Sequence, residues 1–423
     1  MEFNSAPSFV MHIDFNSCFA SIEQQANPFL RGKPVVVASY PTRGGCILAA
    51  SIEAKKLGIK TGMRVFEGQN IFSQLKILSP DPWKYRNVHL KLRRLISEYT
   101  DDFCPKSIDE FVLNLDNYIT CRVDPCKVVA QSTKVRQVAL EIKQRIKKEI
   151  GDWLTVSIGI APNRYLAKIG AGLHKPDGLD EINKNNFLDI YSKLKLTDLT
   201  GIKERNAARL SSMGIFSVRD FYEAPIWRLR AAFHSITGLY WHMRLSGYEI
   251  DDFRSKRASF GNSVALGKNL STTIEISPIL ARLTEKACGR LRGSGYHASG
   301  IHLALIFKDG SFWHKGHKLG SSYFDSRDFY KATFRLLLEA NPQKPVLNIA
   351  VSCFNLTKSD SFQLDLFESL AKQKRLVEAE DQINKKWGDF TISSAKSFTA
   401  GTTVLDRIAF GGVKELEEFT LNS

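Results

Sequence analysis

Short β-prone apolar runs alternate with amphipathic helical stretches over the first 180 residues, and this alternation constrains the fold more than any other feature of the sequence. The runs that predict buried strands lie at residues 9–13, 34–38, 46–50, 106–115 and 154–160. Apolar residues recur at three- and four-residue spacing from Val135 to Ile150, which predicts a helix ending at Gly151. Further helices are predicted at 17–23, 51–57, 90–99 and around Leu166. This order predicts an α+β layer, with helices packed against one sheet.

The rest of the chain divides into segments of different character. Residues 185–245 have an all-helical pattern with turns at Gly201, Gly214 and Gly238, and residues 246–256 lack a period and look like a tether. Residues 257–355 return to strands with two helices between them, and another helix is predicted through 376–387. Because single cores stop growing at roughly 250–300 residues, this chain of 423 residues should form several domains.

The charge of the chain points to a polyanionic partner. Lys and Arg number 59 against 44 Asp and Glu, a formal charge of +15, which suits nucleic acid or an anionic membrane face. Residues 253–320 hold eleven basic and three acidic residues, so the surplus is concentrated there. No apolar run approaches the ~18–20 residues of a spanning helix, so membrane insertion is not expected.

The expected compartment is the cytoplasm. The N-terminus lacks a basic stretch followed by an apolar one, so we expect no secretion. The seven cysteines are irregularly spaced and include no C-x-x-C pair, which indicates neither a zinc site nor a disulfide framework. Reduced thiols in a cytosolic protein are the simplest interpretation.

Three carboxylates lie among β-forming residues rather than on polar surfaces. Asp14 ends an apolar strand, and Asp109 and Glu110 interrupt another. Such acids carry a desolvation cost unless a cation compensates, and converging carboxylates commonly hold Mg²⁺. Two metals roughly 3.5–4 Å apart serve phosphoryl transfer. On these residues alone, an edge strand with solvated acids is an equally good interpretation.

The surrounding segments resemble the motifs of the Y-family translesion DNA polymerases. Residues 12–23 resemble the first catalytic motif of that family, and residues 107–110, Ser-Ile-Asp-Glu, match its second acidic motif. Residues 27–37, 53–58 and 156–168, with a tail at 171–178, also resemble family blocks. Several blocks in the family's order make the resemblance specific, whereas an isolated Ser-Ile-Asp-Glu would not.

The resemblance implies a right-hand polymerase with an α+β multidomain fold. Its parts would be a palm (1–22 and 81–184), small fingers (23–80), a helical thumb (185–245), the tether, an α+β little-finger domain (257–358) and a C-terminal tail (359–423). The implied activity is template-directed, low-fidelity DNA synthesis past damaged bases, in which a primer 3′-hydroxyl attacks the α-phosphate of a dNTP. The partners would be primer–template DNA and dNTPs, and the protein a monomer.

The resemblance also assigns roles near the carboxylates. Asp14, Asp109 and Glu110, with the backbone carbonyl of Phe15, would hold two Mg²⁺ ions, for which Mn²⁺ can substitute. Phe19 stands at the place of the steric gate, an aromatic ring that excludes a ribose 2′-hydroxyl. Without the motif around it, Phe19 would simply be interpreted as a core residue.

The triphosphate would be contacted by basic residues of the palm and fingers. Lys168 is the palm candidate, and Arg43 and Lys55 are the fingers candidates; for Arg43 a solvated surface role is an equal alternative. Many family members have Tyr where this chain has Ile52, so that contact is either missing or supplied by Ser51. Lys55 stands where Arg is frequent, which keeps the charge but loses the bidentate fork.

Two regions are expected to hold DNA. A helix–hairpin–helix pattern includes Gly201 and Lys203, although Lys203 stands where a second glycine is usual, so an ordinary turn remains the alternative. The basic little-finger region has small residues between its charges, which suits sequence-independent phosphate binding. The candidate contacts there are Arg254, Lys256, Arg257, Arg290 and Arg292.

A pentapeptide after the little finger resembles the sliding-clamp motif of bacterial polymerases. In residues 363–367, Gln363 would bond in the clamp pocket, and Leu364, Leu366 and Phe367 supply the apolar contacts. The alternative is one face of a packed helix. Whether the chain is of the polymerase IV or the UmuC type stays open.

Two other functions fit parts of the sequence. A non-catalytic relative that binds only DNA and the clamp would not need the intact carboxylates. A palm-fold nucleotidyl cyclase would need the carboxylates but has no use for the basic domain or the pentapeptide.

Overall fold

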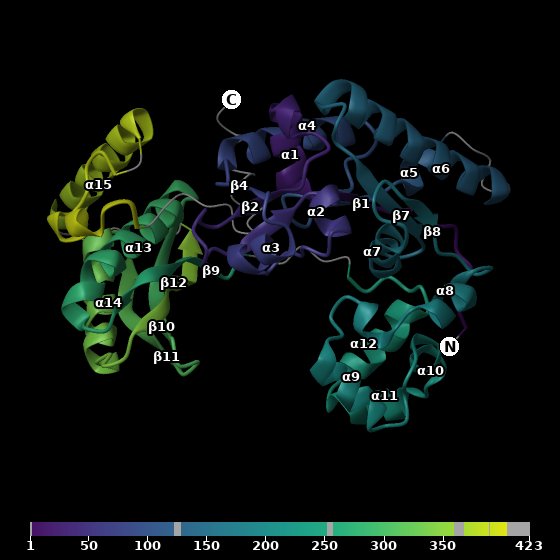
Figure 1. Cartoon of the computed structure of the whole chain (residues 1–423). Coiled ribbons are helices and arrows are strands. Elements are labelled where there is room, and N and C mark those ends of the chain that lie inside the picture. Colours follow the sequence, from purple (N-terminus) through teal and green to yellow (C-terminus); the bar gives the residue numbers. More distant parts are fainter. Residues whose placement is uncertain (1, 122–127, 252–256, 359–367, 389, 404–423) are drawn as a thin grey trace. The chain divides into compact units, whose positions relative to one another are not determined.

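The computed structural model describes residues 2–121, 128–251, 257–358, 368–388 and 390–403. The chain divides near residue 253 into two compact units (Figure 1). In the described part of the chain, the first unit contains two sheets and the second unit contains one, and no sheet or apolar core is shared between the units, so the expectation of several domains agrees with the structure.

A five-stranded sheet in the order β5–β6–β1–β7–β8 is the centre of the first unit. Its members are β1 (Val10–Phe15), β5 (Phe103–Pro105), β6 (Glu110–Asn114), β7 (Val156–Ala161) and β8 (Leu179–Glu181). The central strand β1 is antiparallel to both β6 and β7. Met11 and Ile13 of β1 are fully buried, and by the two-residue period of a strand His12 and Asp14 lie on the opposite face.

Helices cover this sheet. They are α1 (Cys18–Ala26), α4 (Pro82–Ser97), α5 (Asp116–Thr120), α6 (Val128–Arg145), the helical turn η2 (Ile146–Ile150) and α7 (Arg164–Leu173). The apolar stripe predicted from Val135 to Ile150 is confirmed, because Val135, Val138, Ile142 and Ile146 are buried in the main core and Gly151 caps the end of the helix.

A smaller three-stranded sheet, ordered β3–β2–β4, belongs to the same unit. It consists of β2 (Val35–Ala38), β3 (Ile47–Ala50) and β4 (Lys76–Leu78), with the 3₁₀ turn η1 (Pro28–Leu30) before it and the helices α2 (Ile52–Lys56) and α3 (Val65–Ile71) beside it. The first two strands and α2 were predicted from the sequence at these places. Their apolar side chains form a separate small core around Val36 and Ile47.

The predicted all-helical stretch is confirmed. It contains α8 (Phe187–Lys193), η3 (Leu196–Asp198), α9 (Glu204–Ser211), α10 (Val218–Glu223), α11 (Ile226–Phe233) and α12 (Thr237–Leu245). Gly201 and Gly214 adopt positive φ in the turns that precede and follow α9. Gly238 instead lies in α12, where an added Cβ would collide with the backbone of α11 2.4 Å away, so the glycine permits close packing of these helices.

The second unit is a four-stranded antiparallel sheet in the order β11–β10–β12–β9, with helices on one face. The elements are β9 (Ser259–Leu270), α13 (Thr273–Gly293), β10 (Tyr296–Phe307), β11 (Phe312–Tyr323), α14 (Ser326–Ala340), β12 (Val346–Lys358), α15 (Glu368–Trp387) and η5 (Ala395–Thr403). The prediction of strands with two helices between them, followed by one more helix, is therefore confirmed.

Two predicted boundaries were wrong. The strand expected at 106–115 begins only at Glu110, because the backbone N–H groups of Lys106 and Ser107 both donate to the Glu110 carbonyl and close a tight turn. The helix expected at 90–99 begins at Pro82, because the Asp81 carboxylate accepts hydrogen bonds from the backbone N–H groups of Trp83 and Lys84 and caps the helix early.

Candidate active site

Pairing of β1 with β6 brings two of the carboxylates together. Asp14 and Glu110 are direct cross-strand partners. Asp109 lies in the turn that precedes β6, where its backbone carbonyl accepts a 3.0 Å hydrogen bond from the Phe15 N–H. Its side chain accepts a 2.6 Å bond from the Ser107 hydroxyl. The three acids therefore converge at one end of β1.

Two lysine ammonium groups compensate these acids. Lys175 Nζ lies 2.7 Å from Asp14 Oδ1, and Lys168 Nζ lies 2.7 Å from Glu110 Oε2. Burial raises the pKa of Asp14 to about 6, the Lys175 charge opposes this rise, and the charges of Glu110 and Asp109 add to it. The site thus concentrates negative charge that is stable only with cations close by.

The donor set suits a divalent cation. One ligand atom each of His12, Asp14 and Glu110 lies within 4.8 Å of the others. Burial, followed by the nearby charges of Lys168 and Lys175, lowers the pKa of His12 to about 3, so its imidazole is neutral. Neither of its ring nitrogens makes a hydrogen bond within the described residues. Carboxylate oxygens are the ligands that hard divalent ions prefer, and lysines already stand where positive charge is needed.

A cleft of about 490 Å³ opens beside the carboxylates. Asp14, Phe15 and Asp109 line one part of it, and Lys55 and Lys175 add positive charge. Burial, together with the charge of Lys175, lowers the pKa of Lys55, and the acids Asp14 and Asp109 oppose that effect. The cleft therefore places cationic side chains opposite acidic ones, as binding of a metal-complexed anion requires.

Phe19 also lines the cleft and is held by a second ring. Its ring stacks on Tyr85 with centroids 4.2 Å apart and planes 9° from parallel. The Tyr85 hydroxyl donates a 2.9 Å hydrogen bond to Glu23, which is also paired with Lys84 at 2.8 Å. Phe19 is therefore a rigid wall of the cleft as well as a buried residue.

Asn16 ties the strand end to the loop that carries Lys175. Its amide oxygen accepts hydrogen bonds from the Thr155 hydroxyl at 3.0 Å and from the Asp177 backbone N–H at 2.8 Å. Asp177 is in turn paired with Lys143 at 2.9 Å and Lys147 at 3.1 Å. This network fixes the loop beside Asp14, and with it the position of Lys175.

The other predicted triphosphate contacts lie differently. Ser51 is fully buried, and its hydroxyl caps α2 by accepting from the backbone N–H of Ala54 and of Val35, both at 3.2 Å. Arg43 is exposed in the loop between β2 and β3. Lys168 is not among the residues that line the cleft, because its ammonium group is paired with Glu110.

The predicted thumb hairpin lies between η3 and α9. Gly201 has φ of +96°, and its carbonyl accepts a 3.0 Å hydrogen bond from the Asn206 side chain. Lys203 is the exposed N-cap residue of α9. The turn thus keeps its backbone geometry although Lys203 replaces a second glycine.

Arginines of the second unit serve mainly its internal structure. Arg292 donates to Asp381 through Nε and Nη2, both at 2.6 Å, and through Nη1 to the Phe324 carbonyl at 2.9 Å. Arg290 donates to the Gly261 carbonyl and to Asn262. The Arg257 guanidinium lies 4.3 Å above the Phe260 ring. Arg254, Lys256, Gln363, Leu364, Leu366 and Phe367 lie outside the described residues.

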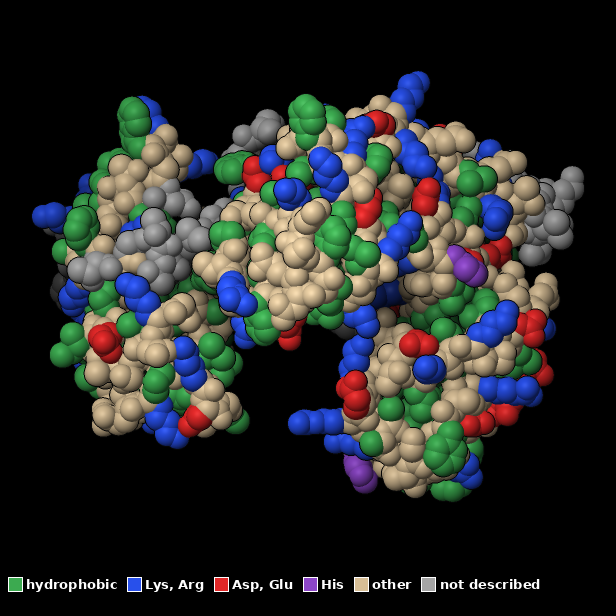
Figure 2. All heavy atoms as spheres, in the orientation of Figure 1, with side chains coloured by type: hydrophobic (Ala, Val, Ile, Leu, Met, Phe, Trp, Pro, Cys, Tyr) green, Lys and Arg blue, Asp and Glu red, His purple; other side chains and the backbone are tan. Residues whose placement is uncertain are grey.

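The face of the second sheet opposite α13 and α14 carries several small side chains, together with larger ones such as His302 and Phe354. Val351, Val264 and Leu303 lie in the core, so the alternate positions face the other way. Cross-strand partners on that face include Ala350 with Ser263 and with Ala304, and His302 with Gly316 and with Ser352. Lys318 of β11 is on the same face, opposite Gly300. Lys and Arg side chains are spread over the visible surface of both units (Figure 2).

Sequence reasoning missed four residues of this site. Lys175 lies within residues 171–178, the tail of the last palm motif, so the resemblance could have indicated it. Its contact with Asp14 is known only from the fold. His12 precedes Asp14 by two residues, which places both on one face of β1. For Tyr85 and Asn16 no sequence signal was available, because their partners depend on tertiary contacts.

No helix in the described part of the chain has the length and apolarity needed to cross a bilayer.

Comparison with known proteins agrees with this geometry. Residues 13–172 match the impB/mucB/samB family, and residues 257–366 match the C-terminal domain of that family. A DNA polymerase IV of Pelotomaculum thermopropionicum is 31% identical over 407 residues, covering 94% of this chain and 97% of the relative. One from Moorella thermoacetica is 33% identical over 411 residues, covering 93% and 97%.

Solved structures give the same result. A Y-family DNA polymerase chimera superposes with a TM-score of 0.72 at 26% identity, covering 82% of this chain and 99% of that one. An insertion ternary complex of the Dbh DNA polymerase covers the same shares with a TM-score of 0.57. With two sequence profiles, full-length relatives and the polymerase fold in agreement, the chain belongs to the impB/mucB/samB family and is a Y-family DNA polymerase.

Proposed function

We propose that this polymerase extends a DNA primer by nucleotidyl transfer at the cleft beside β1, with Asp14, Asp109 and Glu110 holding two Mg²⁺ ions. The observation that carries the proposal is the convergence of these three acids with two lysines at a cleft walled by Phe19. The Phe15 carbonyl would be a further oxygen ligand. When bound, the ions activate the primer 3′-hydroxyl and neutralise charge on the phosphates. Mn²⁺ offers the same coordination chemistry.

The side chains around the ions would orient the nucleotide. Lys55 and Lys175 line the cleft and would bind the triphosphate as point charges. Their positive charge would reduce the repulsion between the phosphate groups of the substrate. Lys168 would hold Glu110 in place through its 2.7 Å ion pair. The Phe19 ring would lie against the sugar and exclude a 2′-hydroxyl. Catalysis then depends mainly on positioning and charge.

DNA would be held by surfaces that contact its phosphate backbone and do not contact base edges. We propose the Gly201 hairpin with Lys203, the Arg257 side chain, and the small-residue face of the second sheet with Lys318. Small side chains allow the backbone of a sheet to approach a duplex closely, and such contacts carry little sequence information. Arg292 is left out because its donors are occupied by Asp381 and Phe324.

We also propose that residues 363–367 bind a sliding clamp, and that the polymerase acts as a monomer in the cytoplasm. The support is the sequence Gln-Leu-Asp-Leu-Phe and its place between β12 and α15. Replacing Gln363, Leu366 and Phe367 with Ala should remove stimulation of primer extension by a clamp. Synthesis without the clamp should be unchanged. Equal stimulation of the variant would contradict the assignment.

Primer extension with dNTPs and Mg²⁺ tests the active site. Asp109→Ala should abolish extension while DNA affinity, measured by fluorescence anisotropy, stays close to wild type. Asp101→Ala removes an exposed acid eight residues earlier and is the matched control. Extension by the Asp109 variant at the wild-type rate would refute the metal assignment. Product formed without primer or template would instead favour a cyclase-like reaction.

A further inference from the structure

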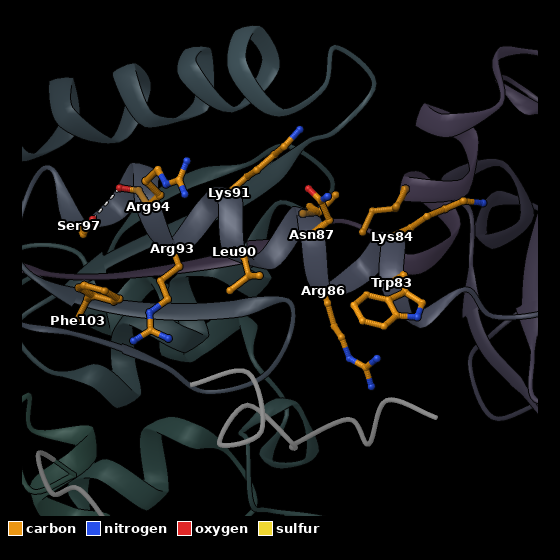
Figure 3. Close-up of a pocket in the computed structure, with 12 residues that line it drawn as sticks. Trp83, Lys84, Arg86, Asn87, Leu90, Lys91, Arg93, Arg94, Ser97 and Phe103 are labelled. Carbon is orange, nitrogen blue, oxygen red and sulfur yellow. Dashed lines mark hydrogen bonds between the residues drawn. The ribbon is translucent and has the colours of Figure 1, made fainter. Parts of the chain in front are cut away.

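A second and larger hollow, about 1070 Å³, runs along the outward face of α4, away from the carboxylates. Trp83, Arg86, Leu90 and Arg93 follow at spacings of three and four, so they share one side of the helix. Figure 3 shows these four side chains pointing to the same side, together with Phe103. We call this surface, defined by these five residues, the α4 groove.

The charge of the α4 groove calls for an anion. The Nη1 atom of Arg93 is buried and has no hydrogen-bond partner within the described residues. Arg93 also makes no ion pair with any described acid. A buried guanidinium nitrogen without an acceptor is costly, so an occupant with carboxylate or phosphate oxygens would stabilise it.

The apolar lining narrows the class of occupant to a peptide. The Trp83 side chain is 66% exposed, and Leu90 and Phe103 add further apolar surface beside the arginines. The Arg86 guanidinium lies 5.6 Å from the Trp83 ring centroid, so charge and aromatic surface are adjacent. A phosphate backbone would leave the apolar surface uncovered, whereas an acidic peptide with apolar side chains would satisfy both.

The chain contains such a segment at its C-terminus. Residues 415–423 include Glu415, Glu417 and Glu418 and no Lys or Arg, although the whole chain carries +15. Leu416 and Phe419 are interleaved with these acids. The eleven residues 404–414 that precede the segment can extend over roughly 36–40 Å, so it is not confined to the surface next to Thr403.

We propose that residues 415–419 of the same chain dock in the α4 groove. The glutamates would accept hydrogen bonds from Arg93 and its basic neighbours, and Leu416 and Phe419 would cover Trp83 and Leu90. The proposal is independent of the catalytic one, since no carboxylate of the cleft lines this groove. The proposed occupant of the groove is the C-terminal segment of the same chain. Binding of a second copy of the chain, or of a nucleic acid, in the groove would contradict the proposal.

Photo-crosslinking of the full chain tests the contact directly. Phe419 is replaced by the photoreactive residue p-benzoylphenylalanine, and the crosslinked peptides are identified by mass spectrometry. We expect crosslinks to residues 82–97. The same replacement at Phe398, which is 80% exposed in η5, is the matched control and should give none there. Equal crosslinking from both positions, or crosslinks from 419 only to other surfaces, would overturn the proposal.

Charge reversals and isotope mixing separate the remaining possibilities. Arg93→Glu, and separately the change of Glu415, Glu417 and Glu418 to Lys, should each lower the crosslink yield roughly tenfold, the scale of one lost charge-assisted hydrogen bond. The tail variant leaves α4 intact, so its result stands even if Arg93→Glu disturbs the fold. Crosslinks between ¹⁵N-labelled and unlabelled chains would overturn docking within one chain. The proposal would also be overturned if the Arg93 variant crosslinked as the wild type does but bound a single-stranded oligonucleotide more weakly.

Discussion

At the scale of single residues, Phe19 combines a structural and a selective role. It is 3% exposed and stacks on Tyr85, so its loss must weaken the core as well as open the cleft. A ring that merely filled the core would affect stability alone. A ring that also lies against the nucleotide sugar must affect the choice between dNTP and NTP.

We predict that Phe19→Ala increases the relative efficiency of ribonucleotide incorporation at least about tenfold, because space for a 2′-hydroxyl appears where the ring was. The same change should lower the free energy of unfolding by about 3–5 kcal/mol, the usual cost of removing a buried Phe. Single-nucleotide kinetics with paired dNTP and NTP measure the ratio. Tyr85→Phe keeps the stack and should leave the ratio unchanged. Lower stability with an unaltered ratio would make Phe19 a core residue only.

The two lysines near the carboxylates should differ in kinetic effect. Lys175 lines the cleft, whereas Lys168 does not and is paired with Glu110. We predict that Lys175→Ala raises KM for the dNTP roughly tenfold, the scale of one charge-assisted contact. Lys168→Ala should lower kcat with a smaller change in KM, because it acts through Glu110. Steady-state kinetics of both variants decide the matter, and a larger KM effect at Lys168 would reverse the assignment.

At the scale of elements, α4 depends on a neutral histidine. The His89 Nδ1–H donates a 2.9 Å hydrogen bond to the Ile108 carbonyl in the segment before β6. Burial lowers the pKa of His89 to about 4 from an ordinary value of 6.5. Its Nε2 has no hydrogen-bond partner among the described residues, so protonation would create a buried donor without an acceptor.

The stability of the first unit should therefore fall in acid. The folded-state pKa of His89 is the lower one, so its contribution is complete above about pH 6.5 and is lost as the pH falls toward 4. We predict a loss of roughly 2–4 kcal/mol over this range, read from hydrogen exchange of α4 and β6 amides. His89→Asn retains the donor to Ile108 and should flatten the dependence. His234→Asn, at an exposed position, should not change it.

Elements with a strong local period were predictable from the sequence, and contacts between distant segments were not. The stripe from Val135 to Ile150 and the strand–helix order of the second unit follow from local spacing. Asp14, Asp109 and Glu110 could be singled out because acids among β-formers are unusual. The pairing of Arg292 with Asp381 joins residues 89 positions apart, and no local pattern encodes it. The helix-capping role of the Ser51 hydroxyl was not predicted from the sequence either.

At the scale of the whole molecule, the net charge of +15 raises the question of which basic side chains form ion pairs within the protein and which contact DNA. Lys315 and Lys318 lie on the same strand, β11, but differ in their surroundings. Lys315 is paired with Glu339 of α14 at 2.7 Å, on the side covered by helices. Lys318 is on the opposite face, among the small side chains proposed to approach the duplex.

We therefore predict different salt responses for two otherwise equivalent changes. Each phosphate contact adds about 0.9 to the slope of log affinity against log salt concentration, because a counterion is released from DNA. Lys318→Ala should reduce the magnitude of the slope by about this amount, whereas Lys315→Ala should leave the slope at the wild-type value. Anisotropy titrations with a primer–template duplex at several salt concentrations measure both. Equal slopes for the two variants would mean that DNA does not bind the small-residue face, and that most of the surplus charge acts elsewhere on the polymerase.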